Sequence, residues 1–231
     1  GVADRVEVLR LDVTDQASID EAMAVADSWV RLAGDVGRLV GLVNNAGVLA
    51  VGPFEELPSE AVDRVLDTNL HGTFAVTRAV LPRLRGHGGR IVCVTSSSGL
   101  GGLPTWSAYA ASKWGVEGWA ESLAFEVGPH GIDVVLVEPG TFPTGIWRAE
   151  ARHGSSDGPY GPMVDAMAAA DRRAAESGGD PVVVARVVAR AFDARMPLTR
   201  RPVGRGAWLR WAARGIVPFG VQRRAVARIV G

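Results

Sequence analysis

The sequence predicts an α/β fold in which a doubly wound parallel sheet lies between two layers of helices. Short apolar runs rich in valine, leucine and isoleucine alternate along the chain with longer segments of helical periodicity. Such runs are typical of strands that are buried on both faces of a sheet. Hydrophobic residues make up 47% of the chain, and no low-complexity linker divides it. We therefore expect a single three-layer domain over residues 1–231.

The first 139 residues contain the regular part of this pattern. Strands are expected at Val6–Val13, Leu39–Asn44, Ile91–Thr95 and Ile132–Glu138. Helical segments separate them, from Thr14 and Asp15 as cap residues to about Leu32, then over 59–85 and over 107–128. Helices of this length between strands imply right-handed crossovers, and crossovers of this kind build a parallel sheet.

The pattern changes after Pro139. Residues 140–162 are rich in glycine and proline and predict a long, mobile loop of the kind that often carries function. Helices are expected over about 163–177 and 181–195, followed by a short strand at Arg201–Val203 and two small helices. Within the single domain, residues 140–231 are thus expected to supply a substrate loop and C-terminal helices.

Composition excludes several classes of function. The single cysteine, Cys93, excludes an internal disulfide framework and a cysteine-based metal site. The four histidines show no metal-ligand spacing, so we expect no metal. The apolar runs are shorter than the ~20 residues that cross a bilayer, and residues 1–15 do not read as a secretory signal. These features predict a cytoplasmic protein.

The charge is distributed unevenly although its total is zero. Residues 1–70 carry 13 acids and five arginines, a net charge of 5 − 13 = −8, whereas residues 194–231 carry nine arginines and no acid. The arginines from Arg200 to Arg228, interleaved with Trp208 and Trp211, could form an amphipathic helix at a membrane surface. A solvated terminal helix is the favoured alternative, and we expect no nucleic-acid partner.

Polar and glycine-rich residues follow each of the four predicted strands. They are Asp12 and Val13, Asn44 to Gly47, Thr95 to Gly99, and Pro139 with Gly140. Ligands of open α/β sheets bind outside the carboxyl ends of the strands. A turn of this type is common by itself, but four of them at one edge predict a ligand cleft.

Tyr109 and Lys113 stand out on the helix predicted over 107–128. Their spacing of four residues places both side chains on one face of the helix. Of the 25 basic residues, 24 are arginines and Lys113 is the only lysine, which indicates a position where arginine would not serve. A snorkelling lysine beside a core tyrosine is the structural alternative.

Ser96 lies 13 residues before Tyr109, and together these motifs resemble the short-chain dehydrogenase/reductase family. The resembling elements, in order, are Leu11-Asp12-Val13-Thr14, Asn44-Asn45-Ala46-Gly47, Asn69, Ser96, Tyr109 with Lys113, and Pro139 to Thr144. The resemblance covers about Val6 to Thr144 and continues more loosely to the end. Asp180-Pro181 and Arg201 to Gly204 resemble the branch that contains hydroxysteroid and retinol dehydrogenases.

The resemblance implies a Rossmann-like fold and an NAD- or NADP-dependent exchange of hydride between an alcohol and a ketone or aldehyde. Tyr109 would be the acid and base, because Lys113 and the charge of the oxidised nicotinamide favour its phenolate. Ser96 would hold the substrate oxygen, and Asn69 would anchor a water relay to Lys113. Asn69 as a solvent-facing helix residue is the alternative, as is a catalytically silent binding or regulatory protein with this fold.

The same resemblance assigns contacts. It implies cofactor contacts for Asp12, Val13, Asn44, Ala46, Gly47, Tyr109, Lys113, Pro139, Gly140, Phe142 and Thr144. Asp12 would accept from the adenine amino group, or it could be a helix-capping residue. The substrate would contact Ser96, Leu103, Trp106, Trp147 and Met163, a mostly apolar set that favours a small hydrophobic alcohol or ketone. A homodimer or homotetramer is also implied.

One departure from the family pattern is large. No glycine-rich TGxxxGxG-type turn precedes Val6, so the sequence does not distinguish NAD from NADP, and the first two strands of the family's sheet are lacking. A truncated sequence and a natural loss of these strands both remain open. We expect residues 1–231 by themselves to bind neither dinucleotide usefully and to be inactive.

Overall fold

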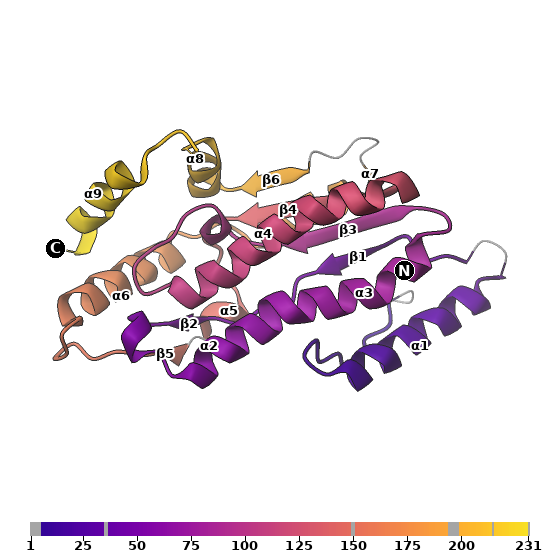
Figure 1. The fold of residues 1–231 in the computed structure, drawn as a ribbon, viewed down its shortest axis with the longest axis horizontal. Coiled ribbons are helices and arrows are strands. Elements are labelled where there is room, and N and C mark those ends of the chain that lie inside the picture. Colours follow the sequence, from indigo (N-terminus) through magenta and orange to yellow (C-terminus); the bar gives the residue numbers. More distant parts are fainter. Residues whose placement is uncertain (1–5, 35–36, 149–150, 194–198, 214, 231) are drawn as a thin grey trace.

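The computed structural model describes residues 6–34, 37–148, 151–193, 199–213 and 215–230. Its main sheet has four strands in the order β1-β3-β4-β6, and every neighbouring pair is parallel. The strands are β1 (Gly41–Asn44), β3 (Gly89–Val94), β4 (Ile132–Pro139) and β6 (Arg200–Val203). The predicted doubly wound α/β fold is therefore confirmed (Figure 1).

Nine helices are described around this sheet. They are α1 (Gln16–Leu32), α2 (Ser59–Leu66), α3 (Gly72–Leu84), α4 (Ser107–Val127), α5 (Gly145–Arg148), α6 (Gly161–Glu176), α7 (Val182–Asp193), α8 (Arg205–Ala213) and α9 (Phe219–Val230). Short 3₁₀ turns lie at η3 (Phe54–Glu56), η5 (Ser97–Gly99) and η6 (Gly128–His130). None of the helices within the described ranges is long and apolar enough to cross a bilayer.

The two faces of the sheet are buried by different helices, which gives the three layers. On one face, Ile91 of β3 and Leu136 of β4 pack against α3 and α4. On the other face, Val92 and Val135 pack with Ala191 of α7. Adjacent residues of a strand point to opposite faces, so a strand covered on both sides must be apolar throughout. The continuous valine-rich runs of β3 and β4 meet this requirement.

The predicted strand at Val6–Val13 is wrong. Residues 6–12 form no strand, and their apolar side chains are exposed, with Val8 at 90%. None of the described strands is paired with this segment, and a β-strand without hydrogen-bonded neighbours is not stable in water. The apolar pattern of the segment is strand-like, but a strand also needs partners that the pattern does not specify.

Two other expectations need adjustment. The segment predicted as one helix over 59–85 contains a π turn at Asp67–His71 between α2 and α3. The predicted long loop over 140–162 contains α5 and the short strand β5 (Ala151–Arg152), which pairs in parallel with β2 (Ala50–Val51). This loop is therefore tied to the segment that follows β1.

Candidate active site

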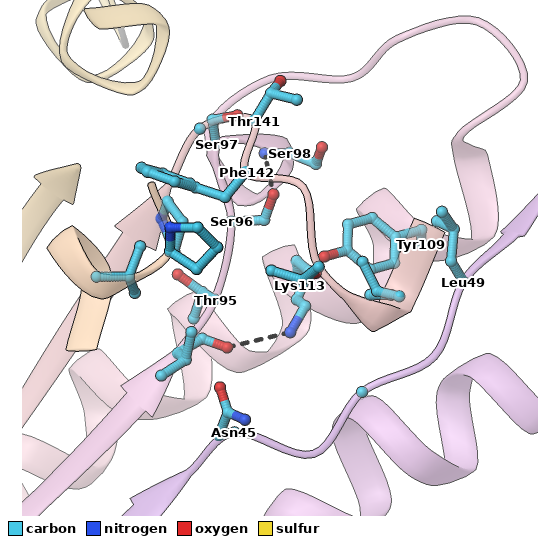
Figure 2. A pocket seen from close by; sticks show the side chains of 18 of the residues that line it. Asn45, Leu49, Thr95, Ser96, Ser97, Ser98, Tyr109, Lys113, Thr141 and Phe142 are labelled. Carbon is cyan, nitrogen blue, oxygen red and sulfur yellow. Dashed lines mark hydrogen bonds between the residues drawn. The ribbon is translucent and has the colours of Figure 1, made fainter. Parts of the chain in front are cut away.

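A cavity of about 1120 Å³ lies at the carboxyl ends of β1, β3 and β4 (Figure 2). Asn45 and Gly47 line it after β1, Ser96 lines it after β3, and Pro139 and Gly140 line it at the end of β4. The predicted convergence of these turns is therefore present. Parallel strands end at one edge, and the chain leaves that edge in different directions, so a cleft opens there.

The helix α4 brings Tyr109 and Lys113 into the wall of this cavity, and both side chains are buried. The Lys113 ammonium donates to the backbone carbonyl of Val94, with 3.1 Å between Nζ and oxygen. It lies 5.6 Å from the centroid of the Tyr109 ring. Figure 2 shows Ser96, Tyr109 and Lys113 directed toward one space. The buried lysine thus has a polar partner inside the protein, and its ammonium does not extend to the surface.

The surroundings change the acidity of both groups. Burial raises the pKa of Tyr109 to about 12, and a hydrogen bond between the Ser96 and Tyr109 side chains acts in the opposite direction. Burial lowers the pKa of Lys113 to about 8, while the charges of Cys93 and Glu117 act to raise it. At neutral pH, Tyr109 therefore holds its proton and Lys113 remains largely cationic.

Asn69 joins the loop after β1 to the helix α4. It lies in the π turn, is 1% exposed, and is therefore not the solvent-facing residue of the alternative reading. Its Oδ1 accepts from the Val48 amide at 2.8 Å, and its Nδ2 donates to the Val48 carbonyl and to Ser112 Oγ, both at 3.0 Å. Ser112 Oγ in turn donates to the carbonyl of Tyr109 at 2.8 Å. These bonds give Asn69 a positioning role, and the water relay stays a prediction.

Gly47 and its neighbours differ in how they face the cavity. A Cβ atom on Gly47 would lie 3.3 Å from Asn69 Oδ1, which is a tight contact, and 3.7 Å from Lys113 Nζ, which is an ordinary one, so the loop runs beside both side chains. Asn44 is buried and its amide donates to Thr77 Oγ1 at 2.8 Å, whereas Asn45 lines the cavity. Neither Asn44 nor Ala46 is in the cavity wall.

Asp12 and Val13 lie outside the cavity wall as well. The Asp12 carboxylate accepts from the amide and the hydroxyl of Thr14, at 2.9 and 2.7 Å, and these bonds lower its pKa. Val13 packs against Gly72, where a Cβ would come within 2.6 Å of a Val13 methyl. Asp12 and Val13 are therefore both engaged in contacts of the turn before α1. The helix itself is capped by Asp15 and not by Asp12.

The segment after β4 forms another wall of the cavity. Pro139, Gly140, Phe142 and Thr144 line it, and Thr141 lines it too, while their contacts with a nicotinamide stay a prediction. The Gly140 amide donates to the carbonyl of Val203 at 2.9 Å, which attaches this segment to β6. A backbone held in this way can present its own amide and carbonyl groups to a ligand.

The predicted substrate residues have different positions. Leu103 and Trp106 line the cavity, while Met163 packs behind it in a cluster that includes Tyr109 and Met167. Trp147 belongs to α5, but its side chain lies outside the described residues. Sequence reasoning missed further lining residues, among them Leu49, Ser97, Ile146, Met167, Asp171 and Arg210.

Asp171 is a buried charge in the cavity wall, on α6. Its carboxylate pairs with the Arg152 guanidinium, with 3.2 Å between Oδ2 and Nη2. Burial raises its pKa, while the charge of Arg152 and hydrogen bonds from Arg152 and Trp106 act in the opposite direction. The charge of Asp171 is therefore already balanced within the protein.

A second charged group, formed by Glu117, Glu138 and Arg200, lies next to the strand and helix that carry Ser96 and Lys113. Thr95, which precedes Ser96, donates through Oγ1 to Glu117 Oε1 at 2.5 Å. Arg200 of β6 pairs with both Glu117 of α4 and Glu138 of β4. Burial and the neighbouring Glu117 raise the pKa of Glu138 to about 7, while Arg200 acts to lower it. Across the ranges that the structure describes, no group of His, Cys, Asp and Glu side chains is arranged to hold a metal ion.

Comparison with known proteins agrees with this geometry. The family model described as short chain dehydrogenase matches residues 2–154. An uncharacterized oxidoreductase of Bacillus subtilis, YusZ, is 34% identical over 94% of this chain and 78% of its own length. Human retinol dehydrogenase 5 is 33% identical over 93% of this chain and 70% of its own.

Solved structures show the same likeness. A short-chain dehydrogenase from Streptomyces avermitilis matches 98% of this chain and 79% of its own, with a TM-score of 0.78 and 32% identity. A short chain dehydrogenase/reductase from Burkholderia phymatum, solved in complex with NAD, matches 83% of this chain and 69% of its own, with a TM-score of 0.67 and 27% identity. On the family model and these relatives, the chain belongs to the short-chain dehydrogenase family.

Proposed function

We propose that this protein is an NAD- or NADP-dependent oxidoreductase that interconverts an apolar alcohol and its ketone or aldehyde. The observation that carries the proposal is the convergence of Ser96, Tyr109 and Lys113 in one largely apolar cavity. The similarity to human retinol dehydrogenase 5 supports an apolar alcohol as the substrate class. A catalytically silent protein would have no use for a buried lysine beside a buried tyrosine.

The residues of the cavity fit a nicotinamide nucleotide. Lys113 has three N–H donors, and the structure shows one acceptor for them, the carbonyl of Val94, which leaves donors for a ribose hydroxyl. Gly47 allows close approach to this lysine, and the backbone of the segment from Pro139 to Thr144 would hold the carboxamide. When bound, the nicotinamide supplies or accepts the hydride.

Tyr109 supplies the proton in the reducing direction. With a pKa of about 12 it carries its proton at neutral pH and can donate it to the substrate oxygen as that oxygen gains negative charge. Ser96, which hydrogen-bonds Tyr109, would hold the same oxygen. In the oxidising direction Tyr109 must accept the proton as phenolate, and the Lys113 cation nearby favours that form.

The test is turnover by the full-length protein, with any residues that precede this sequence, on a panel of apolar ketones and alcohols, followed through the absorbance of the reduced nicotinamide. We expect activity with at least one pair and a loss of kcat of about a thousandfold in Tyr109→Phe, because the ring still fills its place and only the proton is lost. Unchanged binding of the dinucleotide to the variant is the control. Absence of turnover in the wild-type protein despite dinucleotide binding would support a silent protein.

The proposal includes assembly into a homodimer or homotetramer, which the family resemblance implies. Light scattering coupled to size-exclusion chromatography measures the mass in solution. A monomer at all concentrations would contradict this part of the proposal and leave the catalytic part unaffected.

A further inference from the structure

Arg210 is a cation in the cavity wall that lacks an anionic partner. It lies on α8, and its Nη1 is 3.4 Å from the carbonyl of Ser97 and 3.5 Å from that of Gly101. Charge-assisted N–H···O bonds are normally well below 3 Å, so both contacts are weak. No carboxylate in the described part of the chain forms an ion pair with Arg210.

Other partly buried arginines of the protein are satisfied differently. Arg83 pairs with Asp27 at 2.6 Å, Arg90 pairs with Asp133 at 2.9 Å, and Arg200 pairs with glutamates. Burial lowers the pKa of Arg210, and no neighbouring charge acts against this shift. A guanidinium stays protonated in proteins, so Arg210 is a half-buried cation that makes only weak hydrogen bonds to the protein.

The place of Arg210 indicates what it would bind. Its nearest carbonyl belongs to Ser97, the residue that follows the catalytic Ser96, and Ser97 lines the same cavity. Two other charged residues line the wall. Lys113 is assigned to the dinucleotide by the proposed function, and Asp171 is paired with Arg152 and does not compete for Arg210. Apolar side chains, among them Leu103 and Met167, line the same cavity. Besides Lys113, the cavity thus offers a second cation without an anionic partner, together with an apolar lining.

We propose that the substrate is an apolar alcohol or ketone that carries a carboxylate, and that Arg210 binds this carboxylate. The inference rests on the proposed function and narrows its substrate class. A guanidinium presents paired N–H donors that match a carboxylate, which no apolar group can satisfy. The alternative is a purely structural role, in which Arg210 attaches α8 to the turn η5 and the residues after it through the carbonyls of Ser97 and Gly101.

Binding calorimetry separates these accounts without requiring turnover. The full-length protein, saturated with the dinucleotide, is titrated with decanoate and with decanol, which share an apolar chain and differ in charge. We expect decanoate to bind more tightly, and Arg210→Met to weaken decanoate about tenfold or more while decanol changes less than about twofold. Arg210→Lys should recover part of the loss. Arg223→Met, an exposed arginine on α9, is the matched control and should change neither.

Several outcomes would overturn the proposal. Equal binding of decanoate and decanol to the wild-type protein would show that no cation of the protein recognises the carboxylate. An equal loss of affinity for both ligands in Arg210→Met and Arg210→Lys, with lowered melting temperatures, would show that Arg210 only attaches α8 to the turn η5. A loss of dinucleotide affinity with decanoate binding unchanged would assign Arg210 to the cofactor. Turnover of neutral alcohols alone would leave the proposed function standing and refute this inference.

Discussion

Removal of the Asn69 side chain is expected to destabilise the protein strongly because one buried and two partly buried hydrogen bonds depend on it. Asn69→Ala would leave the amide and carbonyl of Val48 and the hydroxyl of Ser112 without this partner. A hydrogen bond contributes about 1 kcal/mol net, and a buried group left unpaired costs about 1–3 kcal/mol. The free energy of unfolding should therefore fall by about 3 kcal/mol or more.

The assay is urea denaturation followed by tryptophan fluorescence, with Ser112→Ala as the matched control. Ser112→Ala removes the bond from Asn69 and the bond to the Tyr109 carbonyl but leaves both Val48 bonds in place. We expect it to cost about 1–2 kcal/mol, less than Asn69→Ala. If Asn69→Ala costs no more than Ser112→Ala, the bonds to Val48 are not holding the loop, and the positioning role is refuted.

Two further predictions concern charge. Lys113→Arg keeps the cation but should lower kcat at least tenfold, because a broad guanidinium cannot replace a compact ammonium that contacts both the Val94 carbonyl and the Tyr109 ring. Steady-state kinetics test this, and an unimpaired kcat would mean that charge alone suffices. Glu138 has its pKa raised from 4.5 to about 7, so the folded state holds a proton that the unfolded state has lost between these values. The stability of the wild-type protein should therefore fall as pH rises from 4.5 to about 7, relative to Glu138→Gln, and parallel pH profiles of the two unfolding free energies would contradict the argument.

Much of the fold could be predicted because its signals are local. The strands β3 and β4 are continuous apolar runs, and α4 has a helical stripe bounded by a glycine, so each boundary came within about two residues. Val6–Val13 has an equally clear local pattern and is not a strand. Hydrogen-bonded pairing of strands depends on two segments, so the pattern of one segment does not show whether it has a partner.

The site was predictable in part for a similar reason. Tyr109, Lys113 and Ser96 belong to a motif with fixed spacing, and the structure places all three in the cavity wall. Asn45 could have been preferred over Asn44, since Asn44 shares the core-facing side of β1 with Leu42, and Asn45 must then face the other way. Arg210 could not be recognised, because most arginines of a basic segment are solvated and only tertiary packing buries this one.

The contacts behind the cavity explain how β3, α4 and β4, which carry its polar residues, keep their spacing. Thr95 is held on one side by β4, where its amide donates to the Val137 carbonyl at 2.8 Å, and on the other by Glu117 of α4. Glu117 lies one turn beyond Lys113 on the same helix, and Arg200 joins it to Glu138, which directly precedes Pro139 of the cavity wall. The position of Ser96 relative to Tyr109 is therefore set by a buried charge cluster as well as by the sheet. Since Arg200 belongs to β6, a segment far along the chain from the motif residues takes part in aligning them.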